Sequence, residues 1–505
     1  MIGAAVDGLA ARNGLEADSL RTGFLLLTNM LLVPGFRALA TARDRHLFSV
    51  LAASLSYCLM FSVLGFVQLL ALALASYVLV RKARSAFWLP VLVFGLNMTV
   101  MSLNHLYRQW ILGAEARMDH TVPMMVMVMK LTSFAWSAHD GTLPDEALSP
   151  TQRQRAIRRL PSTLEFLGFV FFFPSFLIGP TFAYVDYDHF IRREADFAEV
   201  PASFIPAMEC FAASFIPMFL LIKVVPHYTP TKLLDPDFVA GKTFWQQLMY
   251  LHISTALAKC VFYVGWKTAE ASCVLAGFGY NGRGIDGHPR WDRLENCDIL
   301  RIEMAENPRE LLAAWNKNTA NWLREDVYLR LEQAGVSNSM ATTITAFVSA
   351  FWHGVQFGYY FGFLFLSVVT ILARHVRRHV RPLFVDPASK LRIFKPLYDA
   401  AGVVVTQAAI MHVMSPFLLC SFWACMTVFS RIYFAGHIVL LALLAGFETG
   451  ALVHVSKAVG RAVGVSPPGT RRTGAGGSPQ GDVSFVRYAS GRSASVPVVR
   501  LKGGE

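Results

Sequence analysis

The chain has 505 residues, of which 54% are hydrophobic and 16% charged, with a mean hydropathy of +0.42. Soluble globular domains carry about 25% charged residues, so this composition excludes an ordinary soluble protein and indicates a polytopic membrane protein. The formal net charge of +12 comes from basic residues that alternate with apolar segments, which argues against a nucleic-acid-binding module.

Apolar segments recur along most of the chain. A helix needs about 20 residues to cross a hydrocarbon core of ~30 Å, so we expect an all-α fold with roughly ten to twelve transmembrane or re-entrant helices. The candidate segments lie near 22–41, 47–80, 86–107, 121–137, 164–185, 203–225, 244–266, 268–280, 340–373, 398–430 and 432–456. Three of them, 47–80, 340–373 and 398–430, are too long for one straight span. Each of these is predicted to hold two helices or a re-entrant pair.

The two ends of the chain differ from its middle. The first 20 residues contain Asp7, Glu16 and Asp18 and no compact apolar region, so we expect no secretory signal peptide. From about Gly464 the chain is rich in Gly, Ser, Pro and Arg and cannot bury enough apolar surface to fold. The sequence therefore predicts one membrane domain over 1–456 and a flexible basic tail over 457–505.

Basic residues gather at the edges of the apolar segments. Three such groups are Arg81, Lys82 and Arg84; Arg153, Arg155, Arg158 and Arg159; and Arg374, Arg377, Arg378 and Arg381. They are typical of cytoplasmic loops, and they could also bind anionic lipid headgroups or a phosphorylated cofactor. The seven cysteines are scattered without a Cys-x-x-Cys pair and are interpreted as small buried hydrophobic residues. No ligand cluster with metal-binding spacing is present, so no metal is expected.

Two familiar signatures carry little weight in this sequence. Residues 277–282 match G-x-G-x-x-G but lack a strand–helix–strand context, and we interpret them as a turn that ends a helix. His375 and His379 are spaced for one helix face but lie among four arginines, which would repel a cation. No G-x-S-x-G nucleophile elbow occurs, so a serine-hydrolase mechanism is unsupported.

His353 is the first candidate for chemistry. It lies in Ser-Ala-Phe-Trp-His-Gly (349–354), within a stretch from Gln333 to Ala373 that has no Lys, Arg, Asp or Glu. A histidine on an apolar helix is often only a hydrogen-bonded packing residue, but a titratable group in such a run is costly unless it is paired or used. Burial would favour the neutral imidazole, which is the form that a general base requires.

A second informative segment begins at Trp315. It reads WNKNTANWLR (315–324) and continues to Tyr328 and Arg330. Trp and Tyr mixed with Arg and Lys describe an amphipathic stretch at a membrane interface. Its three asparagines exceed what interface anchoring needs. A neutral amide can hold a hydroxyl or a carbonyl without the desolvation cost of a charge.

These segments together resemble the membrane-bound O-acyltransferases, specifically their lysophospholipid acyltransferase branch. The resemblance is carried by WNKNTANWLREDVYLRL and TAFVSAFWHGVQFGYYFGF, and also by MVMVMKLTSFAWSAHDG, FFFPSFLIGPTFAYVDYDHFI and GFGYNGRGIDGHPRWDRLENCDIL. It covers roughly residues 95–375, which the resemblance marks as the catalytic core. In that family, the histidine and the asparagine that match His353 and Asn316 form the active-site pair.

The resemblance implies transfer of a fatty acyl group from acyl-CoA to a lysophospholipid in phospholipid remodelling, with His353 as general base, at the endoplasmic reticulum. Acyl-CoA is then a co-substrate and no cofactor is bound permanently. The candidate substrate-binding residues are Trp315, Lys317, Trp322, Arg324, Tyr328, Arg330, Trp352, Tyr359 and Tyr360. The cations among them could equally have a topological role, and helix packing competes with channel lining for the aromatic residues.

Two alternatives remain open from the sequence. The same fold could act on a sterol, a diacylglycerol or a protein as acceptor. A transporter or channel would place His353 in a proton relay, as buried polar residues in broken helices do in such proteins, but no paired inverted repeats are visible.

Overall fold

The computed structural model describes residues 2–12, 17–112 and 121–465. Within these ranges every element is helical, apart from one isolated β-bridge between Arg283 and Pro289. The predicted all-α fold is therefore confirmed.

Five helices and a short π-helix form the N-terminal part. They are α1 (Ile2–Arg12), α2 (Ala17–Ala38), α3 (Ala42–Met60), α4 (Val63–Ala83), α5 (Leu89–Tyr107) and the π-helix η1 (Arg108–Leu112). The long run 47–80 holds two helices, as predicted, because Ser62 begins α4 by accepting a hydrogen bond from the backbone N–H of Gly65 at 3.2 Å.

Helix α6 (Thr121–Asp140) lies inside the bundle, where 16 of its 20 residues are buried. The segment predicted near 164–185 is not one span. It consists of α8 (Thr163–Val170), a buried irregular stretch, and α9 (Tyr184–Arg192). The stretch between them includes Gly179-Pro180. Irregular backbone at membrane depth is tolerated where protein surrounds it, and here Phe171, Phe172 and Phe173 are fully buried.

The middle of the chain contains one long helix where the sequence predicted two segments, 244–266 and 268–280. Helix α13 (Phe244–Ala276) has 33 residues and passes through Lys267 and Glu270 without a break. These two side chains pair with each other at 3.1 Å, one turn apart, so both charges are satisfied inside the bundle. Gly277 ends the helix with φ of 95°, which confirms that the G-x-G-x-x-G match is a helix-ending turn.

Shorter elements connect these helices. They are η3 (Asp145–Ala147), α7 (Pro150–Arg155), η4 (Ala195–Phe197), α10 (Phe204–Ala212), α11 (Phe215–Lys223), η5 (Val225–His227), η6 (Pro230–Leu234), α12 (Pro236–Val239), α14 (Ile299–Glu303), α15 (Pro308–Ala314), α16 (Lys317–Trp322), the π-helix η7 (Leu323–Tyr328) and α17 (Leu329–Gln333).

The C-terminal part confirms the other two expected breaks. Run 340–373 divides into α18 (Asn338–His353) and α19 (Phe357–His375), and run 398–430 into α21 (Lys395–Met414), α22 (Pro416–Leu419) and α23 (Phe422–Arg431). The remaining elements are η8 (Val376–Val380), α20 (Pro382–Val385), η9 (Lys390–Phe394), α24 (Ala435–Glu448) and α25 (Ala451–Val463). Helix α25 continues past the predicted domain boundary at 456, and the tail from 466 lies outside the described residues.

Seven helices in the described ranges are long and apolar enough to cross a membrane, or eight if the pair α23 and α24, bent by 83°, counts as one span. This number is lower than ten to twelve because several apolar segments are short or interrupted helices. The qualifying stretches are Ala17–Ala38, Val63–Ala83, Leu89–Ile111, Phe204–Leu234, Phe244–Ala276, Phe357–Val380 and Lys390–Leu419.

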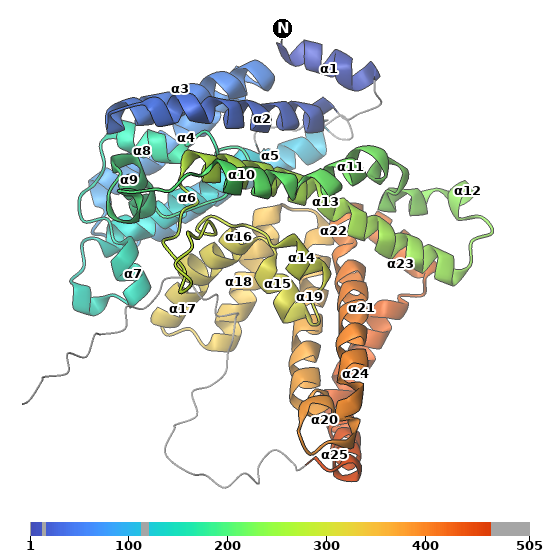
Figure 1. The fold of residues 1–505 in the computed structure, drawn as a ribbon. Helices are drawn as coiled ribbons and strands as arrows, with labels where there is room; N and C mark the ends of the chain where they lie inside the picture. Colours follow the sequence, from blue (N-terminus) through green and yellow to red (C-terminus); the bar gives the residue numbers. More distant parts are fainter. Residues whose placement is uncertain (1, 13–16, 113–120, 466–505) are drawn as a thin grey trace, which may run out of the picture.

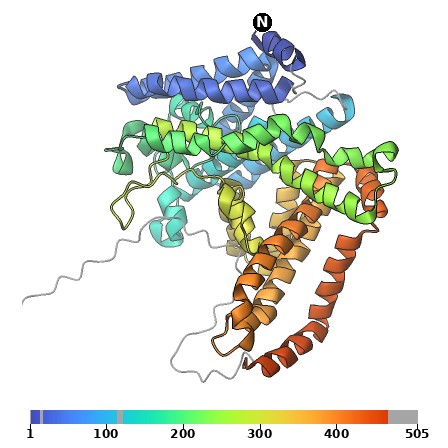
Figure 2. The same cartoon turned by 45° about the vertical axis from the view of Figure 1, so that its right-hand side comes forward.

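The helices form two groups that meet at a steep angle. In Figure 1 the N-terminal helices and α13 lie across the top, whereas α19, α21 and α24 run downward. Figure 2 shows the same division after a turn of the molecule. The short helices α14 to α18 lie between the two groups, so the segments that carry Asn316 and His353 are at their junction.

Lys130 shows how the buried helix α6 is fixed. Its side chain is 1% exposed, and its ammonium group donates to the carbonyl oxygens of Phe169 and Val170 at 3.1 and 3.4 Å. It also lies 4.4 Å from the centre of the Phe182 ring. Lys130 thus satisfies carbonyl groups at the end of α8 that would otherwise lack a donor.

We expect Lys130→Met to lower the free energy of unfolding by about 1–3 kcal/mol, because the carbonyl groups lose a charged donor. The measurement is the thermal unfolding midpoint of the purified protein in detergent. Lys82→Met, at an exposed lysine of α4, is the matched control. Equal midpoints for the two variants would contradict this role.

Candidate active site

His353 is the last residue of α18, next to a break in the backbone. Gly354 follows it with φ of 131° and ψ of −169°, a conformation open essentially to glycine alone. A side chain there would place its Cβ 3.1 Å from Cε2 of Tyr359 and 3.5 Å from the ring of His105. The glycine therefore lets the chain turn tightly from α18 into α19 beside the imidazole.

One hydrogen bond determines which nitrogen of His353 can accept a proton. Nδ1 lies 2.7 Å from the carbonyl oxygen of Ser349, one turn earlier in the same helix. A carbonyl oxygen only accepts, so Nδ1 carries the hydrogen and the neutral ring keeps its lone pair on Nε2. The imidazole is thus held in the tautomer and orientation of a general base.

Four aromatic rings surround this imidazole, and we call them the aromatic cage. Their centroids lie 4.7 Å (Trp352), 5.2 Å (Phe363), 5.4 Å (Phe417) and 6.2 Å (Tyr359) from that of His353. The cage combines α18, α19 and α22. It excludes water from much of the ring, so an alcohol that reached Nε2 would meet few competing hydrogen-bond partners.

Asn316 connects α15 to α16 and has a left-handed backbone conformation, with φ of 44° and ψ of 54°. Asparagine tolerates this region better than most residues, which is one reason for its presence. Its side chain makes no hydrogen bond within the described part of the chain and does not cap the helix that follows. The amide therefore remains available for a ligand.

Helix α6 brings the two segments together. The indole N–H of Trp352, next to His353, donates to the carbonyl oxygen of Met125 at 3.1 Å. The indole N–H of Trp322, six residues after Asn316, donates to Thr132 Oγ1 at 2.9 Å. The two indole rings lie 6.0 Å apart. Asn316 and His353 themselves share no hydrogen bond in the described structure.

The loop before α14 positions the Asn316 segment through Asn296. Asn296 is not among the site residues predicted from the sequence. The backbone N–H of Lys317 donates to the carbonyl oxygen of Asn296 at 2.8 Å. The side-chain oxygen of Asn296 accepts from the backbone and the side chain of Asn318, at 3.1 and 2.9 Å. Asn296 is 3% exposed. His105, beside Gly354, was also missed because it lies far away in sequence, on α5.

The predicted cations all have acidic partners. Lys317 pairs with Glu295, and Arg324 pairs with its neighbour Glu325. A phosphate contact by either side chain would have to compete with a carboxylate.

Arg330 is held more firmly than these two. It forms two hydrogen bonds with Asp140, at 2.9 and 2.6 Å, and its guanidinium lies 4.2 Å from the centre of the Trp136 ring. Within α6, Asp140 lies 15 residues after Met125, the residue that the Trp352 indole contacts. Fifteen residues span about 22 Å along a straight helix. Arg330 is therefore distant from the aromatic cage.

The predicted aromatic residues divide into three groups. Trp352 and Tyr359 belong to the aromatic cage around His353, and Trp322 lies next to Trp352. Trp315 packs against α13, with its ring 5.1 Å from that of Trp266. Tyr328 donates its hydroxyl to Glu332 at 2.9 Å, and Tyr360 faces Phe347 at 5.9 Å.

The fold and this site define a multi-pass α-helical membrane protein with a half-buried imidazole whose Nδ1 is bonded to the backbone. The chain belongs to the membrane-bound O-acyltransferase family, whose model matches residues 107–432. It is 36% identical over 379 residues to the lysophospholipid acyltransferase of Schizosaccharomyces pombe, covering 73% of each chain. It is 31% identical over 418 residues to the lysophospholipid acyltransferase of Saccharomyces cerevisiae, covering 77% of this chain and 67% of that protein. Identity to human membrane-bound glycerophospholipid O-acyltransferase 2 is 33% over 343 residues, covering 65% of this chain and 64% of that protein.

We expect Gly354→Ala to lower acyl transfer at least tenfold, because alanine costs about 1–3 kcal/mol at this backbone conformation and would press on Tyr359. Gly95→Ala, in α5 with no atom within 4 Å of the added methyl, should leave activity unchanged. The measurement is the initial rate per folded enzyme. A Gly354→Ala enzyme as active as the Gly95→Ala enzyme would contradict the need for this turn.

We expect Asp140→Asn and Arg330→Gln each to lower the unfolding midpoint, because breaking a buried ion pair costs about 3–5 kcal/mol. The double variant should recover part of the loss, since no charge is left unpaired. KM for acyl-CoA should stay within twofold in the folded fraction of each. A rise in KM for Arg330→Gln alone, at unchanged stability, would instead favour substrate contact.

Proposed function

We propose that this protein transfers a fatty acyl group from acyl-CoA to the free hydroxyl of a lysophospholipid, with His353 as general base. The single observation that carries the proposal is the hydrogen bond from Nδ1 to Ser349, which leaves Nε2 as the proton acceptor in an aromatic cage. The similarity to proteins named lysophospholipid acyltransferase and glycerophospholipid O-acyltransferase supports the substrate class.

The proposed reaction balances without a further reactant. The acceptor oxygen attacks the thioester carbonyl carbon as Nε2 of His353 takes the hydroxyl proton. The tetrahedral intermediate collapses, the carbon–sulfur bond breaks, and the imidazolium returns the proton to the leaving thiolate. The products are a diacyl phospholipid and free CoA. General-base catalysis of this kind typically contributes about 10²- to 10⁴-fold.

Asn316 is proposed to support this step through its amide group. Its side chain lacks a partner within the described residues, so its N–H could donate to the thioester oxygen as negative charge develops there. Its oxygen could alternatively orient the acceptor hydroxyl. A covalent acyl-enzyme is unnecessary, because a thioester is already activated, and we propose direct transfer between the two bound substrates.

The remaining substrate contacts are also proposals. The aromatic residues around His353 are the best-supported members of the predicted set, because Trp322, Trp352 and Tyr359 lie close to the imidazole or to its neighbour. We propose acyl-CoA as co-substrate, with no permanently bound cofactor, and the endoplasmic reticulum as the compartment. Sterol, diacylglycerol or protein acceptors are the alternatives within the same family.

We expect His353→Ala to reduce acyl transfer by at least 10²-fold and Asn316→Ala by at least tenfold, with no change in the unfolding midpoint. The measurement is the transfer of labelled oleoyl groups from oleoyl-CoA to a panel of lysophospholipids in membranes that contain equal amounts of protein. His454→Ala, an exposed histidine of α25, is the control.

Two outcomes would contradict this proposal. A His353→Ala enzyme that keeps wild-type activity would remove the histidine from the mechanism. Folded wild-type protein that acylates no lysophospholipid would overturn the acceptor class and direct the search to sterol, diacylglycerol and protein acceptors.

A further inference from the structure

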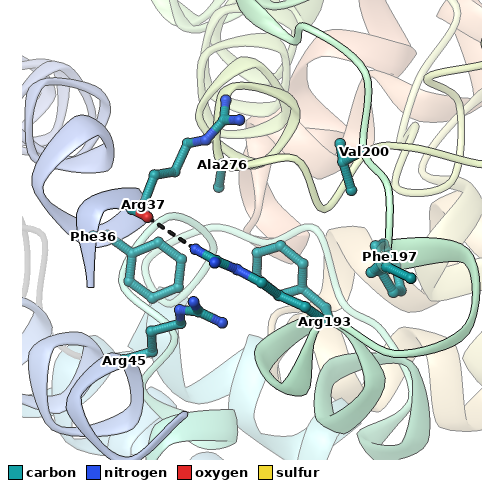
Figure 3. Close-up of a pocket in the computed structure, with 9 residues that line it drawn as sticks. Phe36, Arg37, Arg45, Arg193, Phe197, Val200 and Ala276 are labelled. Atoms are coloured by element: carbon teal, nitrogen blue, oxygen red, sulfur yellow. Dashed lines mark hydrogen bonds between the residues drawn. The ribbon is translucent and has the colours of Figure 1, made fainter. Parts of the chain in front are cut away.

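A cavity of about 330 Å³ lies away from His353, where α2, α3, α9 and α13 meet. Figure 3 shows the residues around it, with the guanidinium groups of Arg45 and Arg193 near the ring of Phe36. The residues that line it are Phe36, Arg37, Arg45, Phe190, Arg193, Phe197, Ala198, Val200 and Ala276. None of them belongs to the predicted catalytic or substrate-binding set.

The cavity is separate from the proposed chemistry. Ala276 is the last residue of α13, and Trp266, ten residues earlier, contacts Trp315 next to Asn316. Ten helical residues span about 15 Å. The cavity therefore lies about 15 Å along α13 from the Trp266–Trp315 contact beside Asn316, and a long ligand could extend between the two places.

Three arginines lie at this cavity, and their described partners are neutral. Arg45 is 4% exposed and donates to the carbonyl oxygens of Leu39 and Ile191. Arg37 donates to the hydroxyl of Ser203 at 2.5 Å and to the carbonyl oxygen of Leu275 at 3.0 Å.

Arg193 donates to the carbonyl oxygen of Arg37 at 3.1 Å, the bond drawn in Figure 3. Two acids of α8 and α9, Glu165 and Asp188, are instead paired with Arg192. No carboxylate in the described residues forms an ion pair with Arg37, Arg45 or Arg193.

Helix ends compensate only part of this charge. Helices α2, α9 and α13 all end at the cavity, and each C-terminus carries about half a negative charge. Three such ends offset about 1.5 of the three positive charges. Capping the helices therefore explains the backbone contacts of the arginines but does not neutralise their three charges.

The walls between the arginines are apolar. Phe36, Phe190 and Phe197 are buried, and the Phe36 and Phe190 rings are stacked with centroids 6.1 Å apart. A small inorganic anion would contact the guanidinium groups but gain nothing from these rings, which already pack against Phe173 and Phe278. A phosphate ester with attached carbon atoms would contact both the guanidinium groups and the rings, and the volume lies at the small end of the range for ligand pockets.

We propose that this three-arginine cavity binds the phosphate group of an amphipathic ligand, separately from the site around His353. Two sources share this chemistry, the headgroup of an anionic phospholipid of the membrane and the phosphates of CoA. The second source rests on the proposed acyl-CoA reaction, whereas the first does not.

The test measures binding without turnover, so it does not depend on the proposed reaction. The full-length protein in detergent is titrated with dioleoyl phosphatidic acid, followed by native mass spectrometry, and separately with CoA, followed by calorimetry. The test variant is Arg37→Gln with Arg193→Asn, since asparagine tolerates the left-handed backbone at 193. The control variant, Arg301→Gln with Arg309→Gln, removes the same charge at exposed sites elsewhere.

We expect the test variant to bind one of the two probes at least tenfold more weakly than the wild type, and the control variant to bind both within twofold. Loss of phosphatidic acid binding identifies a lipid headgroup, and loss of CoA binding identifies the co-substrate. Unchanged affinity for both probes, or an equal loss in the control variant, would overturn the proposal.

A second variant covers the case in which the test variant does not fold. Ala276→Leu keeps all three charges and reduces the open volume at the end of α13. It should weaken binding of the same probe at least fivefold with an unchanged unfolding midpoint. Wild-type affinity for both probes in a folded Ala276→Leu protein would contradict the cavity as the binding site.

Discussion

The buried helix α6 is the constraint on which the rest of the site depends. Side chains from the Asn316 segment and from the His353 segment reach α6 through two indole N–H groups, at Thr132 and Met125. Hydrophobic transfer alone does little to order helices inside a bilayer, because lipid tails are as apolar as the helices. Directional hydrogen bonds can order them, and two short segments thereby take fixed places beside one helix.

The chemistry at His353 follows from where α18 ends. The Ser349 carbonyl oxygen accepts the imidazole Nδ1–H from the last residue of the helix, one turn later. Gly354 then allows an immediate turn, so α19 and α22 can place their rings around the imidazole. One residue thus acts as the end of a helix, the centre of an aromatic cluster and a candidate base.

The sequence predicted the class of the fold because the class depends on local composition. It singled out His353 from its apolar surroundings and from the family resemblance, and the role of this residue stays a prediction. It could not separate a lipid-facing segment from a buried one, since both are apolar, and so 121–137 was counted as an ordinary span. It divided α13 near Lys267, a charge that its partner Glu270 satisfies in the structure. The candidate substrate-binding residues Lys317 and Arg330 could not be weighed without their partners Glu295 and Asp140, which lie 22 and 190 positions away. Pairing across long sequence distances is the information that a single sequence lacks.

The most direct test of the central claim is a cryo-electron microscopy structure with a lysophospholipid and a non-hydrolysable thioether analogue of acyl-CoA. The account predicts that the acceptor hydroxyl lies within hydrogen-bond distance of Nε2 of His353, while Nδ1 keeps its bond to Ser349. It also predicts that the sulfur and the adjacent carbon lie beside the same nitrogen. A complex in which both ligands bind away from the aromatic cage, or in which Nδ1 faces the hydroxyl, would contradict His353 as the general base.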